Sequence, residues 1–124
     1  MILVDTSIWV DHFRAGDARL SGLLNTAEVM QHPFVTGEIA LANLRNRDAI
    51  LTTLQDLPQA QVATDEEMLR FINANAPHGI GIGYIDVHLL ASTLLTPGTL
   101  LWTRDKRLLA ASARLGLAMK AKLR

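Results

Sequence analysis

The sequence contains no cysteine, which excludes disulfide frameworks and thiolate metal sites. Aromatic residues are also scarce, at 5% of the chain. No apolar run approaches the roughly 18 residues that a membrane-spanning helix requires. The apolar run at residues 1–4 is too short for a secretory signal. These absences predict a cytoplasmic protein that makes no use of a membrane.

What the chain does have is a large apolar fraction, 49% of its 124 residues, which is enough for a well-filled core. There is no internal repeat or linker, so a single domain over residues 1–124 is expected. The formal net charge is zero, but from Arg104 to Arg124 the chain carries seven basic residues and one acid. This basic end either binds a polyanion or an acidic protein, or only keeps the protein soluble.

Short apolar runs alternate with helical patterns along the chain. Strands are predicted at residues 1–4, 34–35 and 100–102, with a weaker signal at 60–63. Helices are predicted at residues 6–14, 17–29, 37–45, 47–57, 64–76, 84–95 and 104–115. Thr64 and Glu67 have the spacing of a capping box, and the glycines of 78–83 predict a loop. The alternation predicts an α/β domain around a parallel sheet, with function at the carboxyl ends of its strands.

Two acidic residues follow predicted strands. Asp5 comes directly after residues 1–4, and Asp105 follows 100–102 with two residues between. Because the carboxyl ends of parallel strands share one edge of the sheet, the two carboxylates are expected to be neighbours. Each acid also stands at the start of a predicted helix, where capping is an alternative role.

Two further acids lie on predicted helices. Asp86 falls in the middle of the apolar arc of helix 84–95, where an ionised carboxylate needs a cation or hydrogen-bond donors. Arg70 or a polar network is an alternative partner for it. Glu38 follows the predicted strand 34–35 in the first turn of its helix, where serving the helix dipole is an alternative role.

Four acids near one edge of a sheet are hard oxygen ligands suited to Mg²⁺ or Mn²⁺. Zinc is disfavoured because the four histidines, at positions 12, 32, 78 and 88, have no spacing typical of ligands. We interpret these histidines as surface or loop residues. A cation held by carboxylates typically binds phosphate oxygens and activates water, and the basic stretch beside Asp105 suits a substrate that carries phosphates.

The segments ILVDTSIWVDHFR, TGEIALANLR, GIGYIDVHLLAS and LWTRDKRLLAAS together resemble the PIN-domain ribonucleases, and specifically the VapC toxins of bacterial toxin–antitoxin pairs. The resemblance runs from end to end and implies a three-layer PIN-like fold, with a central parallel sheet flanked by helices. The catalytic acids that hold the metal in that family match, in order, Asp5, Glu38, Asp86 and Asp105. The hydroxyl positions that support the acids or the attacking water match Thr6, Ser7 and Thr103.

The resemblance further implies an endoribonuclease toxin that depends on Mg²⁺ or Mn²⁺ and cuts a structured RNA, such as transfer or ribosomal RNA. It implies a cognate VapB antitoxin as inhibitor, and a homodimer as the usual assembly. The candidates for contacts with RNA phosphates are Arg104, Lys106, Arg107 and Arg114. Two alternatives stay open within the family: a housekeeping PIN nuclease of RNA maturation, and a non-catalytic RNA-binding scaffold.

Two unrelated classes fit the sequence less well. A phosphatase of the haloacid dehalogenase type needs a second acid two residues after the first, where this chain has Ser7. A dinucleotide-binding loop needs G-x-G-x-x-G after the first strand. The glycines of GIGIG have a different spacing and stand just before helix 84–95, where they loosen the loop ahead of Asp86.

Overall fold

The computed structural model describes residues 1–75 and 80–120. At its centre lies a parallel sheet of three short strands, β1 (Ile2–Val4), β2 (Val29–Met30) and β3 (Leu100–Trp102). β1 lies between the other two, with Leu3 opposite Met30 on β2 and Leu101 on β3. All three strands therefore end at one edge, and the segments that follow them lie side by side.

Single parallel bridges extend the sheet at both sides. Gln31, just beyond β2, pairs with Gln59, and Leu101 of β3 pairs with Ala118. The second bridge returns the C-terminal segment to the sheet, with the Met119 amide donating to the Leu101 oxygen at 2.9 Å. These contacts use backbone groups that the outer strands would otherwise expose.

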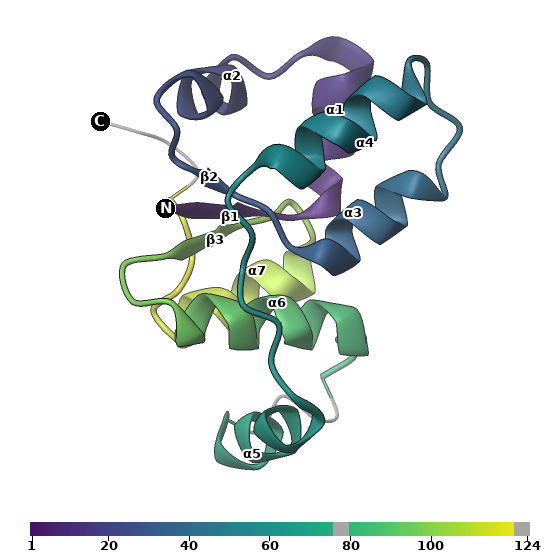
Figure 1. Ribbon diagram of the computed structural model, residues 1–124. Helices are drawn as coiled ribbons and strands as arrows, with labels where there is room; N and C mark the ends of the chain where they lie inside the picture. Colours follow the sequence, from purple (N-terminus) through teal and green to yellow (C-terminus); the bar gives the residue numbers. More distant parts are fainter. Residues whose placement is uncertain (76–79, 121–124) are drawn as a thin grey trace.

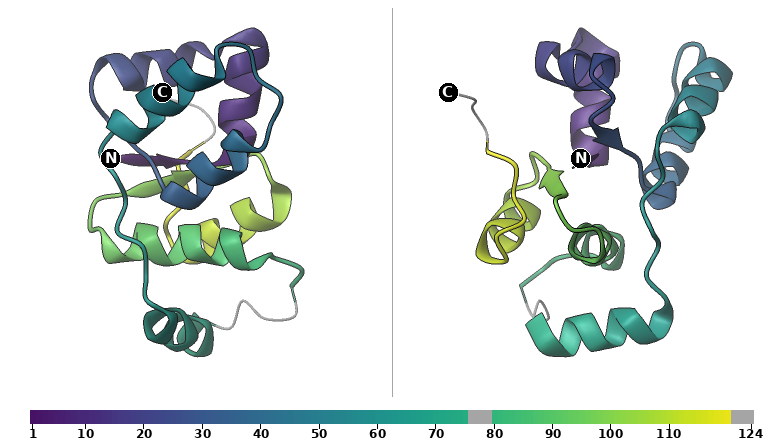
Figure 2. Two further views of the ribbon diagram at one scale, coloured as in Figure 1. Left: turned by 45° about the vertical axis from the view of Figure 1, so that its right-hand side comes forward. Right: turned by 60° about the vertical axis from the view of Figure 1, so that its left-hand side comes forward.

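The helices are α1 (Thr6–Ala15), α2 (Ala18–Asn25), α3 (Pro33–Ala40), α4 (Arg47–Asp56), α5 (Asp65–Asn75), α6 (Tyr84–Leu95) and α7 (Lys106–Arg114). On one side of the sheet lie α1, α2 and α4, and on the other lie α6 and α7 (Figure 1). α5 packs against α6 at the end of the molecule far from α2, as the rotated views show (Figure 2). This arrangement confirms the α/β fold with a central parallel sheet flanked by helices.

The core forms where the strands meet the two helix layers. Leu3 and Leu101 in the sheet are fully buried, as are Ile8 on α1 and Leu90 on α6. Strands of a parallel sheet are covered on both faces, so they appear in the sequence as unbroken apolar runs. This is the reason that ILV and LLW could be assigned as strands from the sequence.

The predicted strand at residues 34–35 is wrong. The middle of the chain supplies Val29–Met30 as β2 instead, and Phe34 lies in the first turn of α3. Pro33 starts this helix, where its missing amide hydrogen has no helical partner to lose. The His32 side chain caps the helix by accepting a hydrogen bond from the Phe34 amide at 3.0 Å. Glu38 consequently lies in the last turn of α3 and not in its first.

The weaker strand signal at residues 60–63 is also wrong, since these described residues have no regular structure. The capping box is confirmed: the Glu67 amide donates to Thr64 Oγ1 at 3.1 Å, and the Thr64 amide donates to Glu67 Oε1 at 2.8 Å. Residues 78 and 79 of the predicted glycine loop lie outside the described residues. Gly116 follows α7 with a φ of 72°, which a glycine adopts without steric cost.

Candidate active site

Asp5 is the first residue after β1, and its side chain is buried, with 6% of its surface exposed. It holds the N-cap position of α1, but its carboxylate does not cap that helix. Instead, Oδ2 accepts hydrogen bonds from Ser7 Oγ at 2.8 Å and from Thr103 Oγ1 at 2.7 Å. The capping role that the sequence left open is therefore not the role of this side chain.

Ser7 and Thr103 form a matched pair that joins the ends of β1 and β3. Thr103 Oγ1 accepts from the Asp105 amide at 3.0 Å, and Ser7 Oγ accepts from the Arg104 amide at 3.1 Å. Each hydroxyl has one proton and already faces a backbone donor, so each donates its proton to Asp5. Both hydroxyls bind Oδ2, and neither occupies Oδ1.

Asp105 follows β3 as predicted, and here the capping role is confirmed. Its Oδ1 accepts from the Leu108 amide at 2.9 Å, at the start of α7. The side chain is exposed, unlike that of Asp5. Asp105 therefore brings a negative charge to the edge of the sheet while one of its oxygens stabilises a helix.

Glu38 is half-buried, and its Oε1 accepts a hydrogen bond from Thr6 Oγ1 at 2.6 Å. Thr6 stands directly after Asp5, so this bond ties α3 to the start of α1. The last turn of a helix carries the negative end of its dipole, which disfavours a carboxylate. The interpretation of Glu38 as an acid that serves only the helix dipole is therefore wrong.

Asp86 lies half-buried in the first turn of α6. Burial, followed by the charges of Asp5, Asp105 and Glu38, raises the pKa of Asp86 to about 6. Arg70 is not its partner, because that guanidinium pairs with Glu66 at 2.6 Å on the exposed face of α5. Since three acids from other elements act on Asp86, the four predicted acids share one edge of the sheet.

The charges of these four carboxylates influence one another, but the carboxylates do not surround one point as the ligands of a bound metal ion would. Over residues 1–75 and 80–120, no three His, Asp or Glu side chains gather into a group that could hold a metal ion. Asp5, Glu38 and Asp105 stand at different places along the chain, and a carboxylate oxygen of each already accepts a hydrogen bond. The oxygen donors fit Mg²⁺ in type, and Mg²⁺ usually keeps several waters, which can bridge to carboxylates that are not direct ligands.

Arg104 differs from the other residues predicted to contact RNA, because its guanidinium group is already paired with two acids. Arg104 Nη1 binds Asp11 at 2.6 Å, and Nη2 binds Asp17 at 2.7 Å. The hydrogen bond to Asp17, followed by the contacts with Asp11, raises the pKa of Arg104. The sequence interpretation missed both acids, because their pairing with Arg104 joins segments 93 and 87 residues apart.

Arg107 and Arg114 project from α7 and bind backbone oxygens. Arg107 Nη1 donates to the Gly81 oxygen at 3.2 Å, and Arg114 Nη2 donates to the Asn75 oxygen at 2.9 Å. A carbonyl group has no net charge, so these contacts do not neutralise the guanidinium groups. Lys106 is exposed at the first position of α7.

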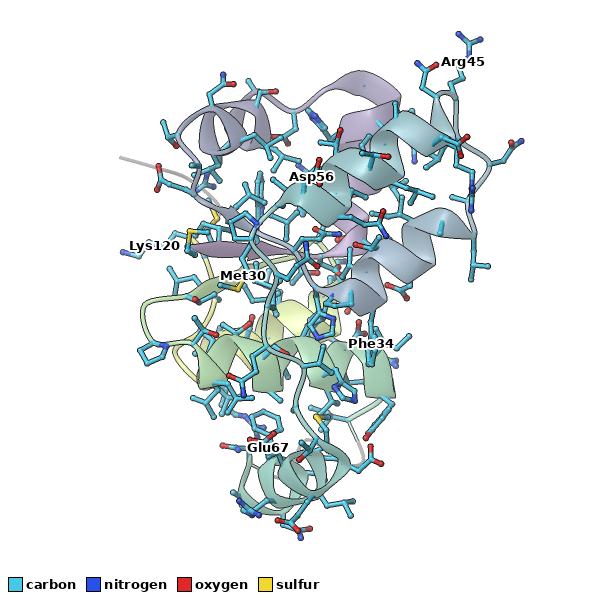
Figure 3. All side chains as sticks on the ribbon, in the orientation of Figure 1. Met30, Phe34, Arg45, Asp56, Glu67 and Lys120 are labelled. Carbon is cyan, nitrogen blue, oxygen red and sulfur yellow. The ribbon has the colours of Figure 1, made fainter. Side chains whose placement is uncertain are left out.

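The surface or loop interpretation of the histidines is wrong for two of them. His32 is 0% exposed and His88 is 3% exposed. The position of His88 beside Leu89 and Leu90 on an apolar helix was a signal for its burial. Figure 3 labels Phe34, whose ring lies between α3 and α6, 4.8 Å from the His88 ring. His78 lies outside the described residues.

Comparison with known proteins gives the family. Residues 2–114 match the PIN domain. The chain is 48% identical over 119 residues to Ribonuclease VapC32 from two strains of Mycobacterium tuberculosis, covering 96% of both proteins. It therefore belongs to the PIN-domain proteins and, among them, to the VapC family.

A solved structure with the same fold is that described as "Structure of FitAB bound to IR36 DNA fragment". The TM-score is 0.57 at 17% identity, covering 91% of both chains, so the likeness concerns the fold alone. The PIN-like fold expected from the resemblance is confirmed. Among the described residues, no helix is both long and apolar enough to cross a membrane.

Proposed function

We propose that this protein is the toxin of a toxin–antitoxin pair, and that it is a metal-dependent endoribonuclease acting on a structured RNA such as transfer or ribosomal RNA. The observation that carries the proposal is the buried carboxylate of Asp5, aligned by two hydroxyls at the edge where burial and the charges of three acids raise the pKa of Asp86. The 48% identity to a protein named Ribonuclease VapC32 supports RNA as the substrate.

The cofactor we propose is Mg²⁺ or Mn²⁺, with Asp5 and Asp86 as the nearest ligands and Glu38 and Asp105 acting directly or through water. The donors are carboxylate oxygens, which suit both ions. The raised pKa of Asp86 reflects burial and an excess of negative charge, and a cation would relieve the second. When bound, such a cation polarises a phosphoryl oxygen and lowers the pKa of a coordinated water.

The residues of the chain itself orient the acids. Ser7 and Thr103 hold the Asp5 carboxylate in one orientation, and Thr6 does the same for Glu38. Without a cation, burial and the charges of the neighbouring acids raise the pKa of Asp86 to about 6, so this carboxylate is mostly ionised at neutral pH and available as a ligand. The half-buried position of Asp86 would strengthen its attraction to a cation relative to a position in water.

For the contacts with RNA phosphates, we propose Lys106, Arg107 and Arg114 on α7. Lys106 and Arg107 add positive charge directly after Asp105, and Arg114 lies two turns further along the face of α7 that carries Arg107. Arg104 would have to exchange two ion pairs for a phosphate contact, so we place it last. A cognate VapB antitoxin would neutralise the toxin, and the excess of acids at this edge would attract a basic side chain of such a partner. A homodimer in the cytoplasm remains the expected state.

The test is cleavage of cellular RNA by the purified protein in Mg²⁺ or Mn²⁺, compared with cleavage in EDTA. We expect cleavage at defined sites that stops in EDTA and is lost in Asp5→Asn. Unchanged cleavage in EDTA, with contaminating nucleases removed, would contradict the proposal. Binding of RNA without cleavage by the wild type would favour the scaffold instead.

A second experiment separates the toxin from a housekeeping nuclease. The protein is expressed in cells with and without the neighbouring gene, and new RNA 5′ ends are sequenced. A toxin should stop growth and create new ends that disappear when the neighbouring gene is expressed as well. Growth that continues, with cuts only in precursor RNA, would favour a role in RNA maturation.

A further inference from the structure

His32 is a fully buried histidine at the carboxyl end of β2, the strand end that carries no acid. Both of its ring nitrogens are bonded. Nδ1 accepts from the Phe34 amide at 3.0 Å, and Nε2 lies 3.1 Å from Ser92 Oγ on α6. Ser92 is itself 0% exposed, and its Oγ donates to the Gln61 oxygen at 2.7 Å.

The directions of these hydrogen bonds follow from counting protons. Gln61 offers a carbonyl, which can only accept, so the single proton of Ser92 points to Gln61. Ser92 Oγ is therefore the acceptor from His32 Nε2, which must carry a proton. Nδ1 must be unprotonated, because it accepts from the Phe34 amide. His32 is accordingly held as the neutral Nε2–H tautomer by its partners.

The helices that His32 joins carry two of the four acids. Its Nδ1 caps α3, which bears Glu38 in its last turn, and its Nε2 holds α6, which bears Asp86 in its first turn. In the described part of the chain, α3 packs extensively against α1 and α4, while α6 packs against α5 and β3. α3 and α6 have few direct contacts with each other, and the side chains that connect them include His32 with Ser92 and the ring of Phe34 with that of His88.

We propose that His32, through its hydrogen bonds to the Phe34 amide and to Ser92, is a positioning residue of the active site that sets the separation of Glu38 and Asp86. This inference rests on the proposed function, since it assumes that these two acids serve one cation. His32 does not touch the acids and acts only through α3 and α6. An error of about 1 Å in the placement of reacting groups can slow a reaction about 100-fold, so such a link affects metal binding and rate as well as stability.

The chain offers a matched pair of variants on α6. Ser92→Ala removes the hydroxyl that receives His32, whereas Thr93→Val removes the neighbouring hydroxyl, which donates to the Leu89 oxygen of the same helix at 2.7 Å. Both residues are buried, at 0% and 1% exposure. Ser92→Ala loses two buried hydrogen bonds, from His32 and to the Gln61 oxygen, and Thr93→Val loses one. Only Ser92→Ala breaks the connection to α3.

The experiment measures Mn²⁺ binding to the metal-free protein by calorimetry, alongside urea unfolding of each variant and cleavage of RNA by the wild type. We expect Ser92→Ala to bind Mn²⁺ more weakly by up to about tenfold, the lower limit for losing a group that hydrogen-bonds a metal ligand directly, because His32 acts through α3 and α6. Thr93→Val should bind Mn²⁺ as the wild type does, with a smaller loss of stability than Ser92→Ala. Equal Mn²⁺ affinities in the two variants would overturn the positioning role.

A second pair of variants tests His32 itself. An asparagine oxygen can replace Nδ1 at the Phe34 amide, and a glutamine amide can replace Nε2 at Ser92. His32→Gln, which keeps the link between the helices, should therefore retain more of the Mn²⁺ affinity than His32→Asn, which keeps only the cap of α3. The reverse order would contradict the proposal.

The outcomes also separate this inference from the function on which it rests. A wild-type protein that binds Mn²⁺ and cleaves RNA, while Ser92→Ala behaves as Thr93→Val does, would defeat the positioning role alone. A wild-type protein that neither binds Mn²⁺ nor cleaves RNA would defeat both. Nitrogen-15 shifts of the His32 ring give a further check, because a proton on Nδ1 would contradict the hydrogen bonds described above.

Discussion

The ends of β1 and β3 differ from the end of β2, although all three lie at one edge of the sheet. Asp5 follows β1 and Asp105 follows β3, and their carboxylates add negative charge where Asp86 is located. Gln31 and His32 follow β2, and both are fully buried and uncharged partners in hydrogen bonds. The edge thus has an acidic part and a neutral polar part.

The neutral part connects the helices that carry the acids. Gln31 Oε1 accepts from Trp9 Nε1 on α1 at 3.0 Å, and Gln31 Nε2 donates to Thr36 Oγ1 on α3 at 2.9 Å. His32 then joins α3 to α6. Charges that repel one another destabilise the folded protein, whereas satisfied buried hydrogen bonds stabilise it. The negative charges and the uncharged hydrogen bonds that connect the helices therefore lie at different strand ends.

The largest effect on RNA cleavage is expected when one carboxylate of the acidic part loses its charge. Asp86→Asn should lower the rate of RNA cleavage on the order of 1000-fold, the scale on which one electrostatic group of an active site acts. Without metal, the same change should stabilise the protein at pH 7 by about 1 kcal/mol, because a half-buried carboxylate with a raised pKa no longer has to ionise. Cleavage assays and thermal melts in EDTA measure the two effects.

The matched control for Asp86→Asn is Asp48→Asn, which alters another first-turn acid whose side chain is fully exposed on α4. It should leave both cleavage and melting temperature nearly unchanged. A lower melting temperature for Asp86→Asn in EDTA, with cleavage retained, would show that Asp86 is a paired structural acid and would remove the acidic part of the comparison.

The contributions of His32, in the neutral part, and of Asp86, in the acidic part, to stability should depend on pH in opposite directions. Burial, together with the facing His88, lowers the pKa of His32 to about 4 from its usual 6.5. The unfolded chain then binds more protons between these values, so the contribution of His32 to stability is complete above pH 6.5 and is lost as the pH falls to about 4. The loss amounts to about 3 kcal/mol for this fully buried group.

Asp86 works against this trend, because its raised pKa makes its contribution to stability fall as the pH rises from about 4 to 6. Urea unfolding at several pH values, in Asp86→Asn and in His32→Asn, separates the two groups. Asp86→Asn should lose stability on acidification more steeply than the wild type, and His32→Asn less steeply. Identical pH profiles in all three proteins would refute the contrast between the strand ends.

Within the acidic part, a variant of Thr103 tests how much the hydrogen bond from this hydroxyl to Asp5 contributes to stability. Thr103→Val removes a hydroxyl that donates to Asp5 and accepts from the Asp105 amide, and should cost about 1–2 kcal/mol of stability. Thr99→Val, before β3, removes a buried hydroxyl that has no hydrogen-bond partner among the described residues, and should be neutral or stabilising. Urea unfolding of both variants checks the difference, and equal losses would contradict it.

The smallest effects are expected on α7. Each of Lys106→Gln, Arg107→Gln and Arg114→Gln should weaken RNA binding similarly for different RNAs. Each should also reduce the slope of log affinity against log salt by about 0.7 if it removes one phosphate contact. Arg104→Gln should change the slope less, because the charge of Arg104 is already paired with Asp11 and Asp17. A larger change for Arg104 would reverse this assignment.

The sequence by itself predicted those features that depend on local pattern. The apolar runs of β1 and β3, the periodicity of α6 and the capping box of α5 are written in neighbouring residues, so they were assigned correctly. The acids after β1 and β3 followed from the rule that parallel strands end at one edge. β2 was misplaced, because a strand of two residues, Val29–Met30, carries too little pattern to outweigh the apolar pair at 34–35.

Only the tertiary structure decided how each of these side chains is used. Asp5 and Asp105 both hold the N-cap position of a helix that follows a strand, yet the Asp5 side chain is held by hydroxyls and that of Asp105 caps its helix. Both acids that pair with Arg104, and the Ser92 hydroxyl that binds His32, come from segments distant in the sequence. A hydrogen bond or ion pair requires atoms about 3 Å apart, and local pattern determines this distance only within one helix or turn. Between elements it is determined by how the helices pack on the sheet.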